Sequence, residues 1–359
     1  MPRLTGNKGE WSELYAFIKL LSTGRLYAAD ENVNRIDNTY FPILKILRSE
    51  NENLDLEYVI RSEDGTVEVH WHAETIRTLS RDRLRRYASS LFAGINDGTN
   101  RAFEIDGADR IMNELACSKI AAPSSDKTDI TMQVHDINTG YEPICGFSIK
   151  SELGNPPTLL NASGATNFVF KVVGVSDREM ERINAINTDS KILDRMEAIS
   201  RIGRMEFQRA KNDNFAGNLM LIDTYMEEII AELLMDYYRN NASDCRTPVR
   251  RLENRNPLGY PRRGMYEYKF KKFLCSVALG MTPARIWDGH DEANGGYVIV
   301  KDDGDVVAYH IYNRDAFETY LLNNTKLERG STTRHGFASI YKEADNEKYI
   351  NLNLQIRFM

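Results

Sequence analysis

The sequence predicts an α/β fold, and three patterns carry this prediction. Apolar residues recur at three- and four-residue steps from Trp11 to Leu21, which indicates an amphipathic helix. Residues 129–134 alternate as a strand does, and residues 144–150 form a second strand-like segment beyond turn residues at 138–140. These two segments predict an antiparallel pair of strands. The third pattern is a strongly amphipathic helical run at 219–238.

The remaining segments divide into expected strands, helices and one loop. Strands are expected at 41–47, 54–60, 66–71, 298–300, 306–311 and 349–358. Helices are expected at 74–92, 108–120 and 270–279, and residues 178–240 are expected to be mainly helical. Residues 245–263 contain three prolines and no helical periodicity, so they predict a long ordered loop.

Composition is that of an ordinary globular protein. The chain has 359 residues, 42% hydrophobic and 27% charged, and a net charge of -6. It contains no apolar run of about 18 residues and no signal peptide pattern, so we expect a cytoplasmic protein that does not span a membrane. Its four cysteines are far apart, which excludes zinc-ribbon spacing and predicts free, mostly buried thiols.

Asp129 and Lys150 are the residues with the clearest chemical potential. Asp129 opens the first strand of the expected pair, and Ser148 and Lys150 share one face near the end of the second. In a hairpin these two strand ends lie side by side, so a carboxylate and an ammonium can converge there. A carboxylate can hold Mg²⁺, which acts on a phosphate and a water, and a lysine can orient that water.

Longer stretches of sequence resemble type II restriction endonucleases of the HpaII-like group. The resemblance is densest at 146–151, 153–154, 158–163 and 166–168, and it includes the ends of the chain at 10–15 and 351–358. It implies a PD-(D/E)XK nuclease core, in which helices flank a mixed sheet. It also implies a homodimer that cuts a short symmetric DNA site, CCGG if the match is close, with cleavage blocked by cytosine methylation.

The resemblance matches Asp129 to the metal-binding aspartate and Lys150 to the motif lysine, and the carbonyl of Ile149 can complete the metal shell. The chain departs from the family pattern at Ser148, where an acid is usual, and at Thr128, where a proline is usual. The second acid therefore stays open. Glu152 has the parity to share the face of Lys150, and Gln133 lies on the face of Asp129. Two glutamates on neighbouring helices, Glu13 and Glu114, can also reach the site as outer acids.

Basic and polar segments predict where DNA binds. Residues 239–272 hold ten Lys and Arg against three acidic residues, and arginine pairs with both phosphate and guanine. The candidate arginines are Arg250, Arg251, Arg255, Arg262 and Arg263, with Arg334 as a further candidate near the C-terminus. A polar cluster after the second strand adds Asn161, Ser163 and Asn167, which either contact DNA or cap their own loop.

These observations favour a Mg²⁺-dependent type II restriction endonuclease that leaves 5'-phosphate ends on double-stranded DNA. We expect an N-terminal region of helices and strands, largely helical, at 1–100 and a PD-(D/E)XK-like catalytic core at 101–240. Residues 241–359 are expected to form a DNA-gripping region made of the basic loop, a helix and the C-terminal strands. A cognate DNA methyltransferase is expected in the same genome, not as a bound subunit. Two alternatives remain: a DNA-binding protein whose nuclease site has decayed at Ser148, and a nuclease for RNA or modified DNA.

Overall fold

The computed structural model describes the chain except residues 1–3, 52–53, 100, 123–127, 241, 243 and 311–312. The chain forms two compact units. Unit 1 comprises Met1–Pro157 and Glu292–Tyr320, and unit 2 comprises Thr158–Asp291 and Leu321–Met359. The expected ranges 1–100, 101–240 and 241–359 follow different limits, because the chain leaves unit 1 after Pro157 and returns to it at Glu292.

Unit 1 is built on a nine-stranded sheet with the order β1-β12-β11-β7-β6-β2-β3-β4-β5. The strands are β1 (Arg25–Ala29), β2 (Arg35–Asn51), β3 (Leu54–Arg61), β4 (Thr66–Trp71), β5 (Glu74–Ser80), β6 (Ile130–Val134), β7 (Ile144–Ser151), β11 (Gly296–Val300) and β12 (Val306–His310). The β1–β12 and β7–β11 pairs are parallel and the others are antiparallel, so the sheet is mixed. The expected antiparallel pair is confirmed, since β6 pairs with β7.

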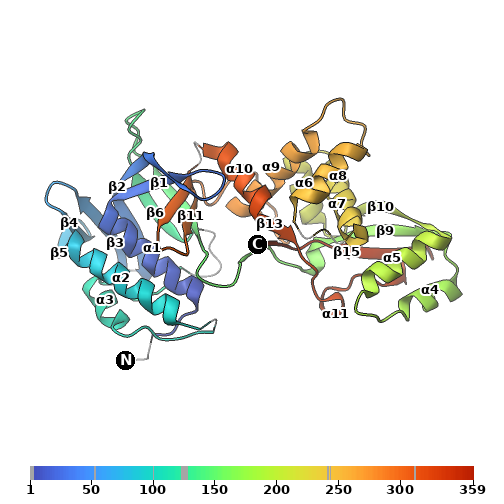
Figure 1. Cartoon of the computed structure of the whole chain (residues 1–359), viewed down its shortest axis with the longest axis horizontal. Helices are drawn as coiled ribbons and strands as arrows, with labels where there is room; N and C mark the ends of the chain where they lie inside the picture. The colour runs from blue at the N-terminus through green and yellow to red at the C-terminus, as the bar shows by residue number, and fades with distance from the viewer. Residues whose placement is uncertain are drawn as a thin grey trace. The chain divides into compact units, whose positions relative to one another are not determined.

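Helices α1 (Lys8–Thr23) and α2 (Arg81–Asp97) pack side by side against this sheet, and α3 (Ala108–Glu114) follows α2 (Figure 1). Helix α1 begins at a capping box, in which Asn7 and Glu10 bond to each other's backbone amides. The helix ends at Gly24, which adopts the left-handed conformation (φ 63°) that glycine tolerates best. The predicted amphipathic face is present: Trp11, Leu14 and Ile18 are fully buried in the core between the helices and the sheet.

Unit 2 contains most of the helices and two smaller sheets. Its helical elements are η1 (Gly164–Thr166), α4 (Asp177–Asn184), α5 (Lys191–Ile202), α6 (Asp213–Ile222), α7 (Met226–Asn240), α8 (Arg246–Arg255), α9 (Met265–Leu279) and α11 (Thr332–His335). Its strands are β8 (Thr158–Leu160), β9 (Asn167–Val173), β10 (Arg204–Ala210), β13 (Thr325–Leu327), β14 (Ile340–Lys342), β15 (Lys348–Asn353) and β16 (Ile356–Phe358). They form sheets of order β10-β9-β15-β14 and β13-β16-β8. Helix α10 (Arg314–Asn324) spans the limit between Tyr320 and Leu321.

Several predicted elements have the wrong type or the wrong limits. The helix expected at 74–92 is strand β5 followed by α2, because Ser80 caps a new helix with its side chain. The N-terminal region is therefore not largely helical, since it contributes five strands to the sheet. Three of these strands lie where strands were expected, at 41–47, 54–60 and 66–71, whereas β1 and β5 were not expected.

The loop expected at 245–263 contains helix α8. Pro248 lies in the first turn of α8, where its missing amide hydrogen costs no hydrogen bond, and Asn256 ends the helix in the left-handed conformation. Proline spacing alone was therefore a misleading signal here.

Other differences concern interruptions that local periodicity did not reveal. The helical region 178–240 is interrupted by strand β10, and the run 219–238 is divided between α6 and α7. The helix expected to reach residue 120 ends at Glu114, and the strand expected at 349–358 is two strands, β15 and β16. Ile311, the last residue of the strand expected at 306–311, lies outside the described residues.

The expected free thiols are confirmed, since none of the four cysteines forms a disulfide and all four are buried. Within the described ranges, no helix combines the length and apolar character needed to cross a membrane.

Candidate active site

Asp129, Ser148 and Lys150 form a hydrogen-bonded chain at the junction of β6 and β7. The pairing of Ile130 with Phe147 places Asp129, just before β6, opposite Ser148 on β7. The ammonium of Lys150 donates to Ser148 Oγ (2.9 Å), and the Ser148 hydroxyl donates to Asp129 Oδ2 (3.0 Å). The structure therefore brings the predicted carboxylate and ammonium to the same face of the sheet, joined through one hydroxyl.

The backbone of β7 also holds the Asp129 carboxylate. The amide of Ile149 donates to Asp129 Oδ2 (2.6 Å), and the amide of Asp129 donates to the carbonyl of Phe147 (2.9 Å). The amide and carbonyl of one strand residue point to the same side of the strand, so the Ile149 carbonyl also points toward the β6 side, on which Asp129 lies. This orientation suits the expected role of Ile149 as a backbone oxygen beside the carboxylate.

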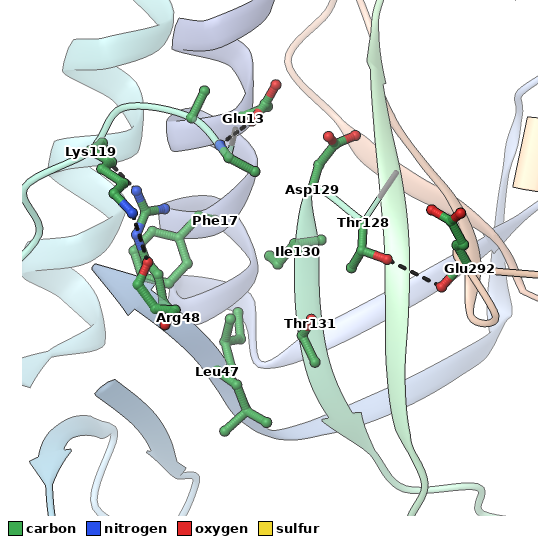
Figure 2. A pocket seen from close by; sticks show the side chains of 14 residues that line it. Glu13, Phe17, Leu47, Arg48, Lys119, Thr128, Asp129, Ile130, Thr131 and Glu292 are labelled. Atoms are coloured by element: carbon green, nitrogen blue, oxygen red, sulfur yellow. Dashed lines mark hydrogen bonds between the residues drawn. The ribbon is translucent and has the colours of Figure 1, made fainter. Parts of the chain in front are cut away.

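A second carboxylate reaches this place from helix α1. Glu13 and Asp129 line one cavity of about 460 Å³, and Glu13 and Lys150 line the adjoining cavity of about 360 Å³. In Figure 2, Glu13 comes from helix α1 and Asp129 from the start of β6, and both lie among the residues that line the larger cavity. Glu13 accepts a hydrogen bond from the amide of Ala122 (3.0 Å), another residue that lines the larger cavity.

Burial, and after it the negative charge of Asp129, raises the pKa of Glu13 to about 8, although Lys150 and Arg48 oppose the shift. The carboxylates of Glu13 and Asp129 repel each other at a mostly buried site. Such a site favours the binding of a cation.

Arg48 and Lys119 line the same cavity and were not singled out from the sequence. Buried Glu50 accepts hydrogen bonds from Arg48 Nε (2.5 Å) and from the amides of Ser118 (2.5 Å) and Lys119 (3.1 Å). Arg48 also donates to the carbonyl of Lys119. This network holds one wall of the cavity in place. The sequence did contain a signal for this network, because Arg48 and Glu50 interrupt the apolar residues near the end of β2.

Glu152, expected as a metal ligand, lies elsewhere. Strand β7 ends at Ser151, and the Glu152 carboxylate accepts from the amide of Asp302 (3.4 Å) in the turn after β11. Its pKa is raised by burial first, and its charged neighbours are Lys301, Asp302 and Asp303. The expectation that Glu152 shares a strand face with Lys150 was wrong, because residue 152 lies beyond the last residue of β7.

Glu114 does not join the site either, because it binds Arg83 (2.6 Å) and Tyr87 on the α2 side of the unit. Among the described residues, no group of three or more Asp, Glu, His or Cys side chains is arranged to hold a metal.

The polar cluster after β7 is mostly structural. Asn167 is fully buried, donates to the carbonyl of His335 (2.8 Å) and accepts from Asn353 (2.7 Å), so its expected contact with DNA is corrected. Ser163 caps the η1 turn by accepting from the amide of Ala165 (3.2 Å), as the alternative interpretation of this cluster stated. Asn161 is exposed and stays a candidate.

The candidate arginines of unit 2 divide into two groups. Arg251 forms an ion pair with Asp236 (3.0 Å), which is 8% exposed, and Arg255 pairs with Glu232 (2.8 Å). Arg250, Arg262, Arg263 and Arg334 are exposed, and within the described part of the chain no ion pair is found for any of them. The first group is already paired with carboxylates of unit 2, and the second is available to a partner.

The raised pKa of Glu13 gives a prediction for stability. The unfolded carboxyl releases its proton near pH 4.5, whereas the folded one keeps it to about pH 8. Between these values the folded state binds more protons, so the free energy of unfolding of the metal-free protein falls as pH rises, by at most about 1.4 kcal/mol per pH unit from this group.

Glu13→Gln removes this contribution. Urea unfolding of both proteins in a chelator from pH 5 to 9 measures it: the stability of the variant relative to the parent should rise up to about pH 8 and then level off. Parallel curves would show that Glu13 is not titrating in this way.

Comparison with known proteins identifies the family of this chain. A profile of the HpaII restriction endonuclease family matches residues 7–358. The curated relative "Type II restriction enzyme HpaII" from Haemophilus parainfluenzae is 41% identical over 359 residues, covering 99% of this chain and 99% of the relative. No solved structure gives a significant match. The protein is therefore a type II restriction endonuclease, a site-specific deoxyribonuclease. Within that class, the chain belongs to the HpaII restriction endonuclease family.

Proposed function

We propose that this enzyme hydrolyses double-stranded DNA with Mg²⁺ and leaves 5'-phosphate ends, using Asp129, Glu13 and Lys150. The observation that supports the proposal is the convergence of two carboxylates and one ammonium beside two cavities that are both lined by Glu13. Glu13 takes the place that the sequence left open for a second acid, and Ser148 links Asp129 to Lys150 instead of supplying a charge.

The residues present fit Mg²⁺. This ion accepts a small number of carboxylates and completes its shell with backbone carbonyls, waters and phosphate oxygens. Asp129, Glu13 and the carbonyl of Ile149 would hold it. When bound, it would supply positive charge to the scissile phosphate and to the attacking water.

The other groups position the reactants. Lys150 stands over the ring of Tyr297 (5.3 Å to the centroid) and donates to Ser148, so its ammonium is held at one place. From there it can donate to the attacking water or to a phosphate oxygen and orient it for in-line attack. Ser148 fixes the relative positions of the ammonium and the Asp129 carboxylate, which is a positioning role.

The recognition site that we propose is CCGG, based on the close relationship to the Haemophilus enzyme. A palindromic site would be matched by a homodimer, because protein and DNA then share a twofold axis. We also propose that the host genome encodes a cytosine methyltransferase that protects its own sites, and that the enzyme acts in the cytoplasm.

Digestion of a plasmid of known sequence tests this function. With Mg²⁺ we expect discrete fragments whose mapped ends lie at CCGG and carry 5'-phosphates, and no fragments from DNA with methylated cytosines. An intact plasmid together with a gel shift would instead support a binding protein with a decayed site. Cleavage of RNA, or of methylated DNA alone, would support the other alternative.

We further propose that Arg250, Arg262 and Arg263 contact DNA, whereas Arg251 and Arg255 hold unit 2 together. The double variant Arg262→Ala and Arg263→Ala should weaken DNA binding and make its salt dependence shallower, by about one unit for each phosphate that is no longer neutralised. Arg251→Ala is the matched control, since it leaves the buried Asp236 carboxylate without its ion-pair partner. It should lower the free energy of unfolding and keep DNA affinity nearly unchanged. Equal losses of affinity in both variants would contradict this division.

A further inference from the structure

A pocket of unit 1 at the C-terminal end of helix α1 has an unusual lining. The pocket has a volume of about 540 Å³. Four arginines, two tyrosines and three hydroxyl-bearing residues line most of it: Arg25, Arg35, Arg81, Arg85, Tyr27, Tyr40, Ser22, Thr23 and Ser62. Among the residues that the structure describes, no carboxylate lines it. In a chain with a net charge of -6, this is a local concentration of positive charge.

Two of the arginines are held in place by tyrosine rings. The guanidinium of Arg25 lies over the ring of Tyr40 (4.6 Å), and that of Arg35 lies over the ring of Tyr27 (3.5 Å). The two rings are 5.5 Å apart on the paired strands β1 and β2. Stacking of this kind fixes the guanidinium planes and leaves their edges to donate hydrogen bonds.

Arg81 closes the pocket from helix α2. It donates through Nε to the carbonyl of Ser22 (2.9 Å) and also donates to the carbonyl of Thr23, so it caps the last turn of α1. The pKa of Arg81 is lowered by burial and then by the positive charges of Arg85 and Arg25. The three guanidinium groups therefore repel one another, and an anion among them would relieve this repulsion.

Only part of the positive charge is compensated by the protein. Arg35 pairs with Asp37 (2.9 Å) and, at a longer distance, with Asp305 (3.6 Å). Arg85 pairs with Asp82, whose side chain is 72% exposed. An exposed pair of this type is weak and competes poorly with a doubly charged ligand. Within the described ranges, no ion pair is found for the other two arginines of the pocket.

This pocket is separate from the catalytic centre. Ser49 of β2 lies level with Asp129, since Leu47 pairs with Thr131, whereas Tyr40 is nine residues earlier on the same strand. Nine residues of strand span roughly 30 Å along the chain. A phosphate bound at the pocket is therefore not the phosphate that is cut.

We propose that this arginine pocket binds a phosphate group, with Arg25 and Arg85 as its main ligands and the hydroxyl of Ser62 as a further donor. Arginine's planar fork matches phosphate oxygens with paired hydrogen bonds, and the tyrosines hold that fork in place. The phosphate belongs either to a small free anion or to a nucleotide chain, and the chemistry of recognition is the same.

Calorimetric titration of the full-length protein in a chelator, at low salt, tests the proposal. Inorganic pyrophosphate and a 5'-phosphorylated dinucleotide are the two probes, and they separate the two sources of phosphate. We expect at least one probe to bind saturably, and Arg25→Ala and Arg85→Ala each to weaken it by about tenfold or more. Arg86→Ala is the matched control, because Arg86 is the next residue of the same helix, is exposed and does not line the pocket. Its affinity should stay within about twofold of the parent protein.

Lys150→Ala serves as the second control, because it removes an ammonium from the catalytic centre and should not change the binding. The proposal is overturned if neither probe binds saturably, if Arg25→Ala and Arg85→Ala bind as tightly as the parent protein, or if Lys150→Ala abolishes binding. Thermal unfolding of each variant verifies that it is folded. Because this titration does not involve cleavage, its failure leaves the proposed nuclease function unaffected.

Discussion

Asp129→Asn is expected to lower the cleavage rate by about a thousandfold or more while DNA binding is retained. Asparagine keeps an oxygen that can accept from Ile149 and Ser148, so the local geometry survives. The charge that would hold Mg²⁺ is lost, and stabilisation of transition-state charge by such an ion amounts to several kcal/mol. Single-turnover cleavage and a gel shift without metal measure the two effects separately.

The matched control for this variant is Asp136→Asn. Asp136 lies in the turn of the same hairpin, where it accepts from Asn138 and Thr139, and an asparagine can make the same turn. Its cleavage rate should be that of the parent protein. Lys150→Met, which keeps the length of the side chain and removes the ammonium, should match the loss of Asp129→Asn. Full cleavage by either site variant would remove the proposed mechanism.

Glu13→Gln is expected to weaken Mg²⁺ or Mn²⁺ binding by about tenfold or more and to lower cleavage by about a hundredfold. The physical reason is that a divalent ion neutralises the repulsion between Glu13 and Asp129, and this gain disappears when Glu13 becomes neutral. Calorimetric titration of the metal into the protein without DNA supplies a measurement independent of activity.

Glu152→Gln separates this proposal from the one that strand parity suggested. Its carboxylate bonds to Asp302 and not to the residues around Asp129, so metal affinity and cleavage should both change by less than about twofold. If Glu152→Gln loses metal binding and Glu13→Gln keeps it, the second acid has been assigned to the wrong residue.

Local pattern was sufficient where a segment's own side chains determine its conformation. The α1 helix follows from its apolar periodicity and capping box, and strands β6 and β7 follow from alternation and a turn. Because antiparallel register is set by a short turn, the hairpin also placed Asp129 opposite Ser148. The family resemblance was likewise readable from residues alone, and the comparisons confirm it.

Local pattern failed where neighbours distant in sequence decide. The segment 74–80 is a strand because it pairs with β4, and Pro248 is compatible with α8 because of its place in the first turn. From the sequence, the polar side chain of Asn167 was a candidate to contact DNA. In the structure this side chain is buried, and its amide is already hydrogen-bonded to His335 and Asn353.

The sequence by itself determined the family, the α/β class and the pairing of Asp129 with Lys150 through a hairpin. Only the tertiary structure decided which acid faces that pair, which arginines are already neutralised and where a second group of arginines gathers around α1. The physical reason is that electrostatic environment and burial depend on which elements pack together: Glu13 and Asp129 repel each other because helix α1 packs against β7, a contact that no local periodicity encodes.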